Sequence, residues 1–205
     1  MERCTVVGIL LHRWYFNMIK NFFKHLKTVI THRHYVMRNC FYCGLYLQGL
    51  THDLSKFSPT EFWESVKYYN GKISPIDVCK KENGVSYAWQ HHKGRNKHHC
   101  EYWTDRYDEG TVAVKMPYKY ALELVCDYIG AGIAYSGGIK NFSMEGEFKW
   151  WLNKRKTLYI HEETKKFVDV YMYMFLKYGV KKVLTNKKTN DIIKTYYEKG
   201  EFKAC

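Results

Sequence analysis

Residues 49–62 of the chain read Gly-Leu-Thr-His-Asp-Leu-Ser-Lys-Phe-Ser-Pro-Thr-Glu-Phe. Within them, Ser58-Pro59-Thr60-Glu61 is a capping box with proline at the first helical position, which predicts a helix over 59–69. The same stretch closes an apolar run with helical spacing over 33–50. The His52-Asp53 pair lies between these two segments. This part of the chain is therefore predicted to be a helix, a histidine–aspartate pair and a second helix.

Helical patterns dominate the rest of the chain as well. A helix over 118–127 is expected to end at Gly130 and Gly132. Strand signals are nearly absent, because no Asn-Gly turn is flanked by alternating apolar residues. Two insertion-like loops are expected, over 71–84 and 105–115. The predicted fold class is all-α, a helical bundle with additional C-terminal helices. The other predicted helices cover 19–30, 33–50, 85–92, 97–104, 144–158, 162–178 and 188–198.

Length and composition fit one globular domain. The 205 residues can bury a core of their own, and 46% hydrophobic with 26% charged residues is ordinary for a globular protein. We expect residues 1–17 to be a loosely attached N-terminal extension and 18–135 to form the core. Residues 136–205 are expected to add C-terminal helices that pack on this core within the same domain. The sequence leaves open whether these aromatic, basic helices also form a dimer face.

Charge and cysteine content narrow the partners and the compartment. A formal charge of +13 favours polyanionic partners, which include nucleotides, nucleic acid and acidic proteins. The seven cysteines are an odd number, and we find no convincing secretory signal, so reduced thiols in a cytoplasm are expected. No apolar stretch reaches the roughly 20 residues that span a bilayer, so no membrane partner is expected.

Histidines and aspartates recur along the chain in an order that suggests a metal site. His32 precedes His52-Asp53, the pairs His91-His92 and His98-His99 follow, and Asp127 closes the series. Imidazole and carboxylate ligands suit a divalent transition metal such as Mn, Fe, Co, Ni or Zn. Each of these features alone is more often structural, so the weight lies in their order. The choices within 91/92 and 98/99 stay open, with His92 and His98 favoured.

This order resembles that of the HD-domain phosphohydrolase superfamily, an all-helical fold named for its His-Asp pair. In that superfamily a minimal set of two histidines and two aspartates holds one divalent ion, and two further histidines can hold a second. The resemblance implies that one or two ions bind here through His32, His52, Asp53 and Asp127, with His92 and His98 or His99 as the additional pair.

Longer stretches resemble a family of clostridial-type bacteria and their phages that is known only as a domain of unknown function. This resemblance implies a fold and a site without an agreed substrate. It also makes His32, rather than His34, the expected first ligand. The stretches that carry it are residues 32–40, 49–62, 88–103 and 116–128.

Cations near the expected site favour a phosphate substrate. Lys56 follows Asp53 by three residues, and Arg95 lies in the loop between the histidine pairs, where a guanidinium could grip a phosphate bidentately. Glu101 could accept a proton from metal-activated water or orient His98, and Glu123, one turn before Asp127, could orient a ligand likewise. The residues predicted to act in catalysis are Asp53, Lys56, Arg95 and Glu101.

Two functions are compatible with these observations. The first is a metal-dependent phosphohydrolase, in which metal-activated water attacks the phosphorus of a small, nucleotide-like phosphoester. The alternative is a non-enzymatic basic protein, such as a phage-encoded factor, that binds nucleic acid or a host protein and has structural histidines. Salt-dependent affinity for DNA without bound metal would favour the alternative.

Overall fold

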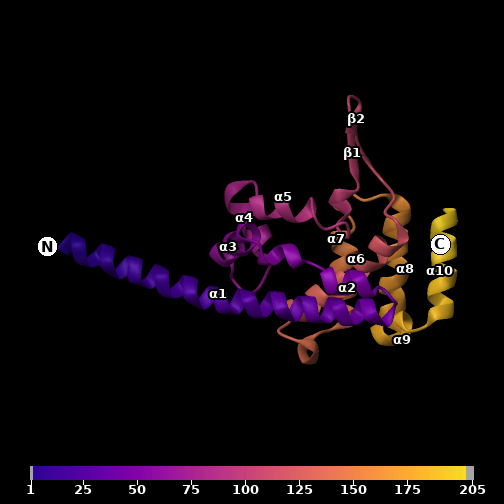
Figure 1. Ribbon diagram of the computed structural model, residues 1–205, viewed down its shortest axis with the longest axis horizontal. Helices are drawn as coiled ribbons and strands as arrows, with labels where there is room; N and C mark the ends of the chain where they lie inside the picture. Colours follow the sequence, from indigo (N-terminus) through magenta and orange to yellow (C-terminus); the bar gives the residue numbers. More distant parts are fainter. Residues whose placement is uncertain (1, 202–205) are drawn as a thin grey trace. The chain divides into compact units, whose positions relative to one another are not determined.

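The computed structural model describes residues 2–201 and is predominantly α-helical, which confirms the predicted fold class. The chain forms two compact units. Unit 1 comprises the residues up to Ile30 together with Leu54–His92, and unit 2 comprises Thr31–Asp53 together with the residues from Lys93 onward. Helix α1 (Glu2–Tyr42) supplies residues to both units (Figure 1).

The N-terminal helices differ from the prediction. The two helices expected over 19–30 and 33–50 are instead α1, which continues to Tyr42, and the short α2 (Tyr46–Thr51). Gly44, with φ of +79°, lies in the turn that separates them. The residues from Glu2 to 17 form the first turns of α1. The division of the chain at residues 17 and 135 stays a prediction. Within residues 2–201, no helix combines the length and the apolar character that crossing a bilayer requires.

Unit 1 consists of short helices that pack on the N-terminal part of α1. The rings of Phe22 on α1 and Phe62 on α3 lie 5.2 Å apart, and α3 begins as predicted, since Ser58 Oγ accepts a hydrogen bond from Glu61 N. The prediction of a loop over 71–84 was wrong, because residues 75–83 are helical. This helix has too few apolar residues to form a clear stripe in the sequence, although Pro75 marks its first position. These elements are η1 (Leu54–Phe57), α3 (Pro59–Tyr68), α4 (Pro75–Asn83) and α5 (Tyr87–Lys93).

Unit 2 contains the large hydrophobic core, centred on α6 and α8. Trp151, Phe167, Tyr171 and Phe175 are fully buried there, and α8 has the bounds predicted for it, 162–178. In Figure 1 the later helices of this unit, from residue 118 onward, run from pink through orange to yellow. They are α6 (Tyr118–Tyr135), η3 (Ile139–Asn141), α7 (Met144–Lys154), α8 (Glu162–Tyr178), α9 (Val180–Leu184) and α10 (Lys187–Lys199).

Gly130 and Gly132 do not end α6, contrary to the prediction, because the helix continues to Tyr135. Both glycines instead permit close packing. A Cβ atom at Gly130 would lie 2.4 Å from Cγ2 of Val36 on α1, and one at Gly132 would overlap the carboxylate of Glu147 on α7. The missing side chain at Gly130 therefore lets α1 and α6 approach each other closely.

A two-stranded antiparallel ribbon replaces the helix expected over 97–104 and the loop expected over 105–115. β1 (Thr104–Tyr107) pairs with β2 (Gly110–Ala113), after the 3-10 turn η2 (Cys100–Tyr102). The ribbon extends away from the helices of unit 2 (Figure 1). Its residues are almost all exposed, so no alternation of apolar and polar residues marked them as strands.

Candidate metal centre

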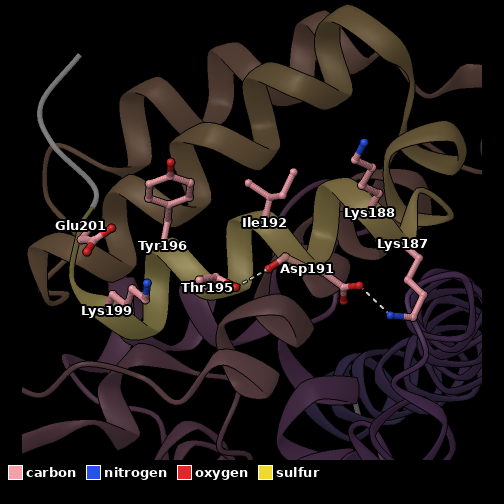
Figure 2. A pocket seen from close by; sticks show the side chains of 8 residues that line it. All are labelled: Lys187, Lys188, Asp191, Ile192, Thr195, Tyr196, Lys199 and Glu201. Carbon is pink, nitrogen blue, oxygen red and sulfur yellow. Dashed lines mark hydrogen bonds and ion pairs between the residues drawn. The ribbon is translucent and has the colours of Figure 1, made fainter.

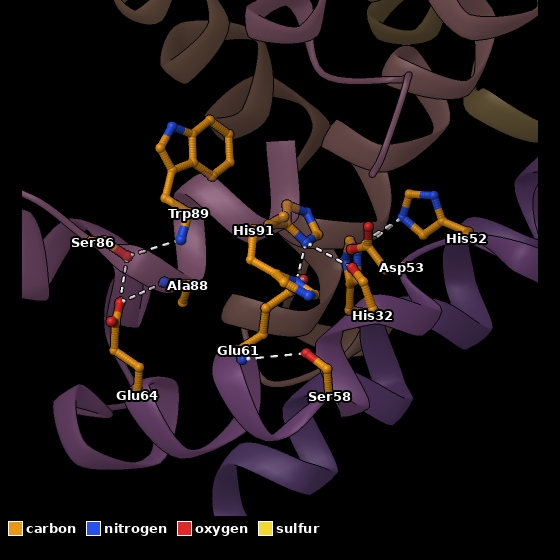
Figure 3. Close-up of polar contacts among 12 residues, drawn as sticks. His32, His52, Asp53, Ser58, Glu61, Glu64, Ser86, Ala88, Trp89 and His91 are labelled. Atoms are coloured by element: carbon orange, nitrogen blue, oxygen red, sulfur yellow. Dashed lines mark hydrogen bonds and ion pairs between the residues drawn. The ribbon is translucent and has the colours of Figure 1, made fainter. Parts of the chain in front are cut away.

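Four side chains from three segments of unit 2 bring their polar atoms together. His32 lies on α1, His52 and Asp53 directly follow α2, and Asp127 lies on α6. His32 Nε2 is 3.1 Å from Asp53 Oδ2, 3.2 Å from Asp127 Oδ1 and 3.2 Å from His52 Nε2. His52 Nε2 is 3.5 Å from Asp53 Oδ2 and 3.4 Å from Asp127 Oδ1. Figure 3 shows the two imidazoles beside the Asp53 carboxylate.

These separations match those between neighbouring ligands of one metal ion. Ligands about 2.1 Å from a transition metal lie about 3.0 Å apart at right angles and about 3.4 Å apart at tetrahedral angles. All four residues are buried, each less than 10% exposed. The group is therefore a buried His₂Asp₂ set that could hold a divalent ion.

The turn that carries the His-Asp pair has an unusual backbone. Asp53 has a φ of +52°, and among residues 2–201 no other residue except glycine has a positive φ. Aspartate and asparagine tolerate this left-handed conformation better than most side chains. Arg33, next to His32, donates from Nε to the His52 carbonyl at 2.8 Å and from Nη2 to the Leu50 carbonyl at 3.1 Å. Sequence reasoning missed this anchor, which ties the turn to α1.

Glu123 accepts hydrogen bonds from two imidazoles of the site and thereby holds their orientation. Its Oε1 is 2.9 Å from His52 Nδ1 and 3.1 Å from His98 Nδ1. An ionised carboxylate only accepts hydrogen bonds, so both Nδ1 atoms carry hydrogen. A neutral His52 then has an unprotonated Nε2 that faces the two aspartates. Carboxylates that hold metal-binding histidines in this way are typical of metal sites. The sequence suggested such a role for Glu123 only in general terms.

The charges of the cluster favour a cation. Burial lowers the pKa of His98, but its bonds to Asp53 and Glu123 outweigh burial and raise that pKa to about 10. Burial also lowers the pKa of His52, but the Asp53 charge and the hydrogen bonds to Asp127 and Glu123 outweigh it, so this pKa is raised. Burial raises the pKa of Asp127, yet bonds from His32 and His52 bring it well below its usual range. The buried carboxylates of Asp53, Glu123 and Asp127 thus stabilise positive charge at this position, whether it is a protonated histidine or a metal ion.

The other predicted histidine ligands belong to different units. His98 is buried in unit 2, with Nε2 3.4 Å from Asp53 Oδ1, and the half-buried His99 ring lies 4.3 Å from the His98 ring. His92 is buried in unit 1, where its Nδ1 lies 2.7 Å from Glu61 Oε2. The pKa of Glu61 is lowered because bonds from its histidine partners outweigh the effect of burial. Glu61 is a residue whose side-chain role the sequence did not reveal.

The predicted catalytic residues other than Asp53 belong to three different segments of the structure. Lys56 is half-buried in η1 of unit 1, and Arg95 is exposed in the segment after α5. The Glu101 carboxylate accepts a hydrogen bond from Cys100 Sγ at 3.3 Å. The carboxylate bonded to Nδ1 of His98 is that of Glu123. Direct roles for Lys56, Arg95 and Glu101 stay predictions.

A pocket of about 700 Å³ lies on the surface of α10, away from this chemistry (Figure 2). Its wall is a row of exposed side chains along one helix and Glu201 just beyond it, and Asp191 there pairs with Lys187 at 2.6 Å. It contains no histidine, so we place the candidate site at the buried cluster instead. The pocket is lined by Lys187, Lys188, Asp191, Ile192, Thr195, Tyr196, Lys199 and Glu201.

A family model described as a family of unknown function (DUF5662) matches residues 21–173, more than half of the chain. The chain belongs to this family. The matched span of this chain contains all four residues of the His₂Asp₂ set, together with Glu61 and Glu123. No curated protein and no solved structure matches the chain significantly.

Proposed function

We propose that this member of DUF5662 is a metal-dependent phosphohydrolase that acts on a nucleotide-like phosphoester. The observation that carries the proposal is the convergence of four ligand atoms, with separations of 3.1 to 3.5 Å, in a buried site. The likeness of the ligand order to the HD-domain superfamily supports the reaction class. The formal charge of +13 supports an anionic substrate.

The residues present fit a divalent transition metal. His32, His52, Asp53 and Asp127 would hold the ion, and the two aspartates would offset its charge. Mixed imidazole and carboxylate ligands suit Mn, Fe, Co, Ni or Zn. When bound, such an ion supplies Lewis acidity, which activates water and polarises a phosphoryl oxygen.

The protein's own groups orient the ligands and balance charge. Glu123 keeps the proton of His52 on Nδ1, so that Nε2 stays available as a ligand atom. Arg33 holds the carbonyl of His52 and thereby the turn that presents Asp53. Arg95, which the sequence predicts to bind phosphate, would offset the negative charge of the substrate.

Metal analysis of protein purified without a histidine tag is the first test. We expect at least one equivalent of transition metal in the wild type and much less in Asp127→Asn, because this variant removes one anionic ligand. The surface variant Asp191→Asn is the matched control. Wild-type protein with only traces of metal would contradict the proposal, and salt-dependent DNA binding by such protein would favour the basic binding protein instead.

The second test is phosphate release from mononucleotides, cyclic nucleotides and dinucleotides with Mn²⁺ or Co²⁺ added. We expect release by the wild type and by Asp191→Asn, and a loss of at least about 10²-fold in Asp53→Asn, since removal of a charged group that acts in the transition state typically costs this much. Equal release by wild type and Asp53→Asn would mean that the buried cluster does not carry the activity.

A further inference from the structure

Two free thiols of unit 2 lie next to each other at the junction of α1 and α6. Cys43 Sγ is 4.0 Å from Cys126 Sγ. Cys43 directly follows α1, in the turn that contains Gly44, and Cys126 lies on α6 next to Asp127. Both belong to the same compact unit. The two cysteines are 83 positions apart in the sequence, so the fold alone brings them together.

The distance between the sulfurs is close to that of a bonded pair. A disulfide requires a separation of about 2.05 Å, so the two sulfurs must approach by roughly 2 Å. Cys126 lies within a regular helix, whereas Cys43 lies in a turn beside Gly44, whose φ is +79°. The Cys43 thiol donates only weak hydrogen bonds, to the carbonyls of Cys40 at 3.3 Å and of Asn39 at 3.5 Å. Cys43 is therefore the member of the pair that is free to rotate.

The two thiols also differ in their access to solvent. Cys126 is fully buried, whereas Cys43 is half-buried and packs against the edge of the unit 2 core. Cys40, one turn before Cys43, is fully buried as well. An oxidant that arrives from solvent therefore meets Cys43 first. A reachable thiol beside a second thiol that can resolve it is the usual arrangement of redox-sensitive cysteines.

We propose that Cys43 and Cys126 are a redox-sensitive dithiol, which a peroxide converts to a disulfide between α6 and the turn after α1. The proposal needs no metal ion, so it stands independently of the proposed function. Disulfides that form in a reducing compartment, such as the sequence predicts here, are usually transient and redox-sensing.

The reaction takes place in two steps. The Cys43 sulfur attacks one oxygen of hydrogen peroxide, the O–O bond breaks, and the other oxygen leaves as water with the thiol proton. The product is a sulfenic acid at Cys43. The Cys126 sulfur then attacks the Cys43 sulfur, an S–S bond forms, the S–O bond breaks, and a second water leaves. Together the two thiols lose two electrons, and the peroxide is reduced to two molecules of water.

Peptide mapping by mass spectrometry is the first test. The full chain is treated with hydrogen peroxide, the remaining thiols are alkylated, and the protein is digested without reduction. We expect a peptide pair joined through Cys43 and Cys126, which dithiothreitol separates. Wild type in which Cys43 stays reduced, pairs with another cysteine or is oxidised without pairing would overturn the proposal.

Three variants sharpen this test. In Cys126→Ala the sulfenic acid at Cys43 has no resolving thiol, so dimedone should trap it there, whereas Cys43→Ala should give neither the adduct nor the joined peptides. Cys79→Ala is the matched control, because it removes a buried thiol of unit 1. It should form the same joined peptides as wild type. Absence of the dimedone adduct at Cys43 in Cys126→Ala would show that Cys43 is not the first thiol to react and would overturn the proposed order.

Thermal unfolding is the second test. The disulfide would join residues 83 positions apart, and a cross-link that closes so long a loop restricts the unfolded chain strongly. We expect the oxidised wild type to unfold roughly 10 °C above the reduced protein, whereas peroxide should leave the Tm of Cys43→Ala unchanged. Cross-linked protein with an equal or lower Tm would mean that the sulfurs meet only by distorting unit 2, which would overturn the proposed geometry.

Discussion

Replacement of Gly130 by alanine tests whether close contact between α1 and α6 builds the metal centre. The new Cβ would lie 2.4 Å from Val36 Cγ2, 3.1 Å from Val36 N and 3.3 Å from the His32 carbonyl oxygen. Ordinary contact begins at 3.4 Å, so the nearest approach is short by about 1 Å. The Val36 side chain is fully buried and has no free space to move into, and the two backbone atoms are themselves closer than 3.4 Å, so the helices must separate to admit the methyl group.

The sign of the stability change follows from two opposing effects. Alanine is favoured over glycine within a helix by about 1 kcal/mol, whereas overpacking of a core typically costs about 1–3 kcal/mol. Because the Val36 side chain that blocks the new methyl group is fully buried, and backbone atoms also lie within 3.4 Å, we take the upper part of that range, for a net loss of about 1–2 kcal/mol. For a chain of this length, the corresponding drop in Tm is roughly 2–8 °C.

The same displacement should weaken metal binding. His32 on α1 and Asp127 on α6 are ligand atoms 3.2 Å apart, on the two helices that the methyl group separates. Metal–ligand distances tolerate only about 0.2 Å, so a shift of up to 1 Å should lower Co²⁺ affinity at least about tenfold, which corresponds to about 1.4 kcal/mol. Thermal unfolding and calorimetry measure the two effects.

Two further variants make this prediction refutable. In Gly146→Ala the new Cβ on α7 meets nothing closer than 3.6 Å, so this variant should be as stable as the wild type or more so. Val36→Ala in the Gly130→Ala background removes Cγ2 and should recover part of the lost stability. A Gly130→Ala protein that is more stable than wild type, or that gains nothing from Val36→Ala, would refute the reasoning.

Three other predictions concern charge and metal. Glu123→Ala should lower Co²⁺ affinity about 10- to 100-fold, whereas Glu123→Gln should lower it much less. A single Glu123 oxygen accepts hydrogen bonds from both His52 and His98, and an amide oxygen can accept both as well. Equal losses in the two variants would contradict this geometry. His25 has a pKa lowered to about 4 by burial and by Lys56, so its contribution to stability is complete above the unfolded pKa of 6.5 and is lost as the pH falls toward 4. The difference amounts to up to about 3 kcal/mol, and urea unfolding should show a weaker pH dependence in His25→Phe than in wild type. Finally, free Co²⁺ at about 100 times its Kd should stabilise the protein by about 2.7 kcal/mol. An unchanged Tm on addition of Co²⁺ would exclude a site that is specific to the folded state.

Most of the fold was predictable because the helices carry clear start and stop signals. α8 has the predicted bounds, since a broad apolar stripe ends at Gly179. The errors arose where local signals have two meanings. Gly130 looks like a helix end in sequence but is a contact between helices, which only packing reveals. The exposed strands β1 and β2 have no buried face, so no periodic pattern predicted them.

The candidate site was predictable in its residue types and only partly in its geometry. The order of histidines and aspartates along the chain, together with the family resemblance, placed His32, His52, Asp53 and Asp127 in one group, and the structure brings their ligand atoms together. The carboxylate partners were harder to predict. The spacing of Glu61 from Ser58 predicts a capping residue, and no local pattern indicates its contacts with His91 and His92 on α5, about 30 residues later.

The left-handed backbone at Asp53 makes that position unequal to Asp127. Asp127 lies within a regular helix, so its backbone accepts any ordinary side chain, whereas Asp53 must satisfy both the ligand chemistry and a φ of +52°. Asparagine retains the shape and the tolerance for this backbone while it removes the charge. A saturation library should therefore allow fewer folded substitutions at 53 than at 127. Asp53→Asn is then the variant of choice for capturing an uncleaved substrate from cell extract. Mass spectrometry could identify the captured substrate.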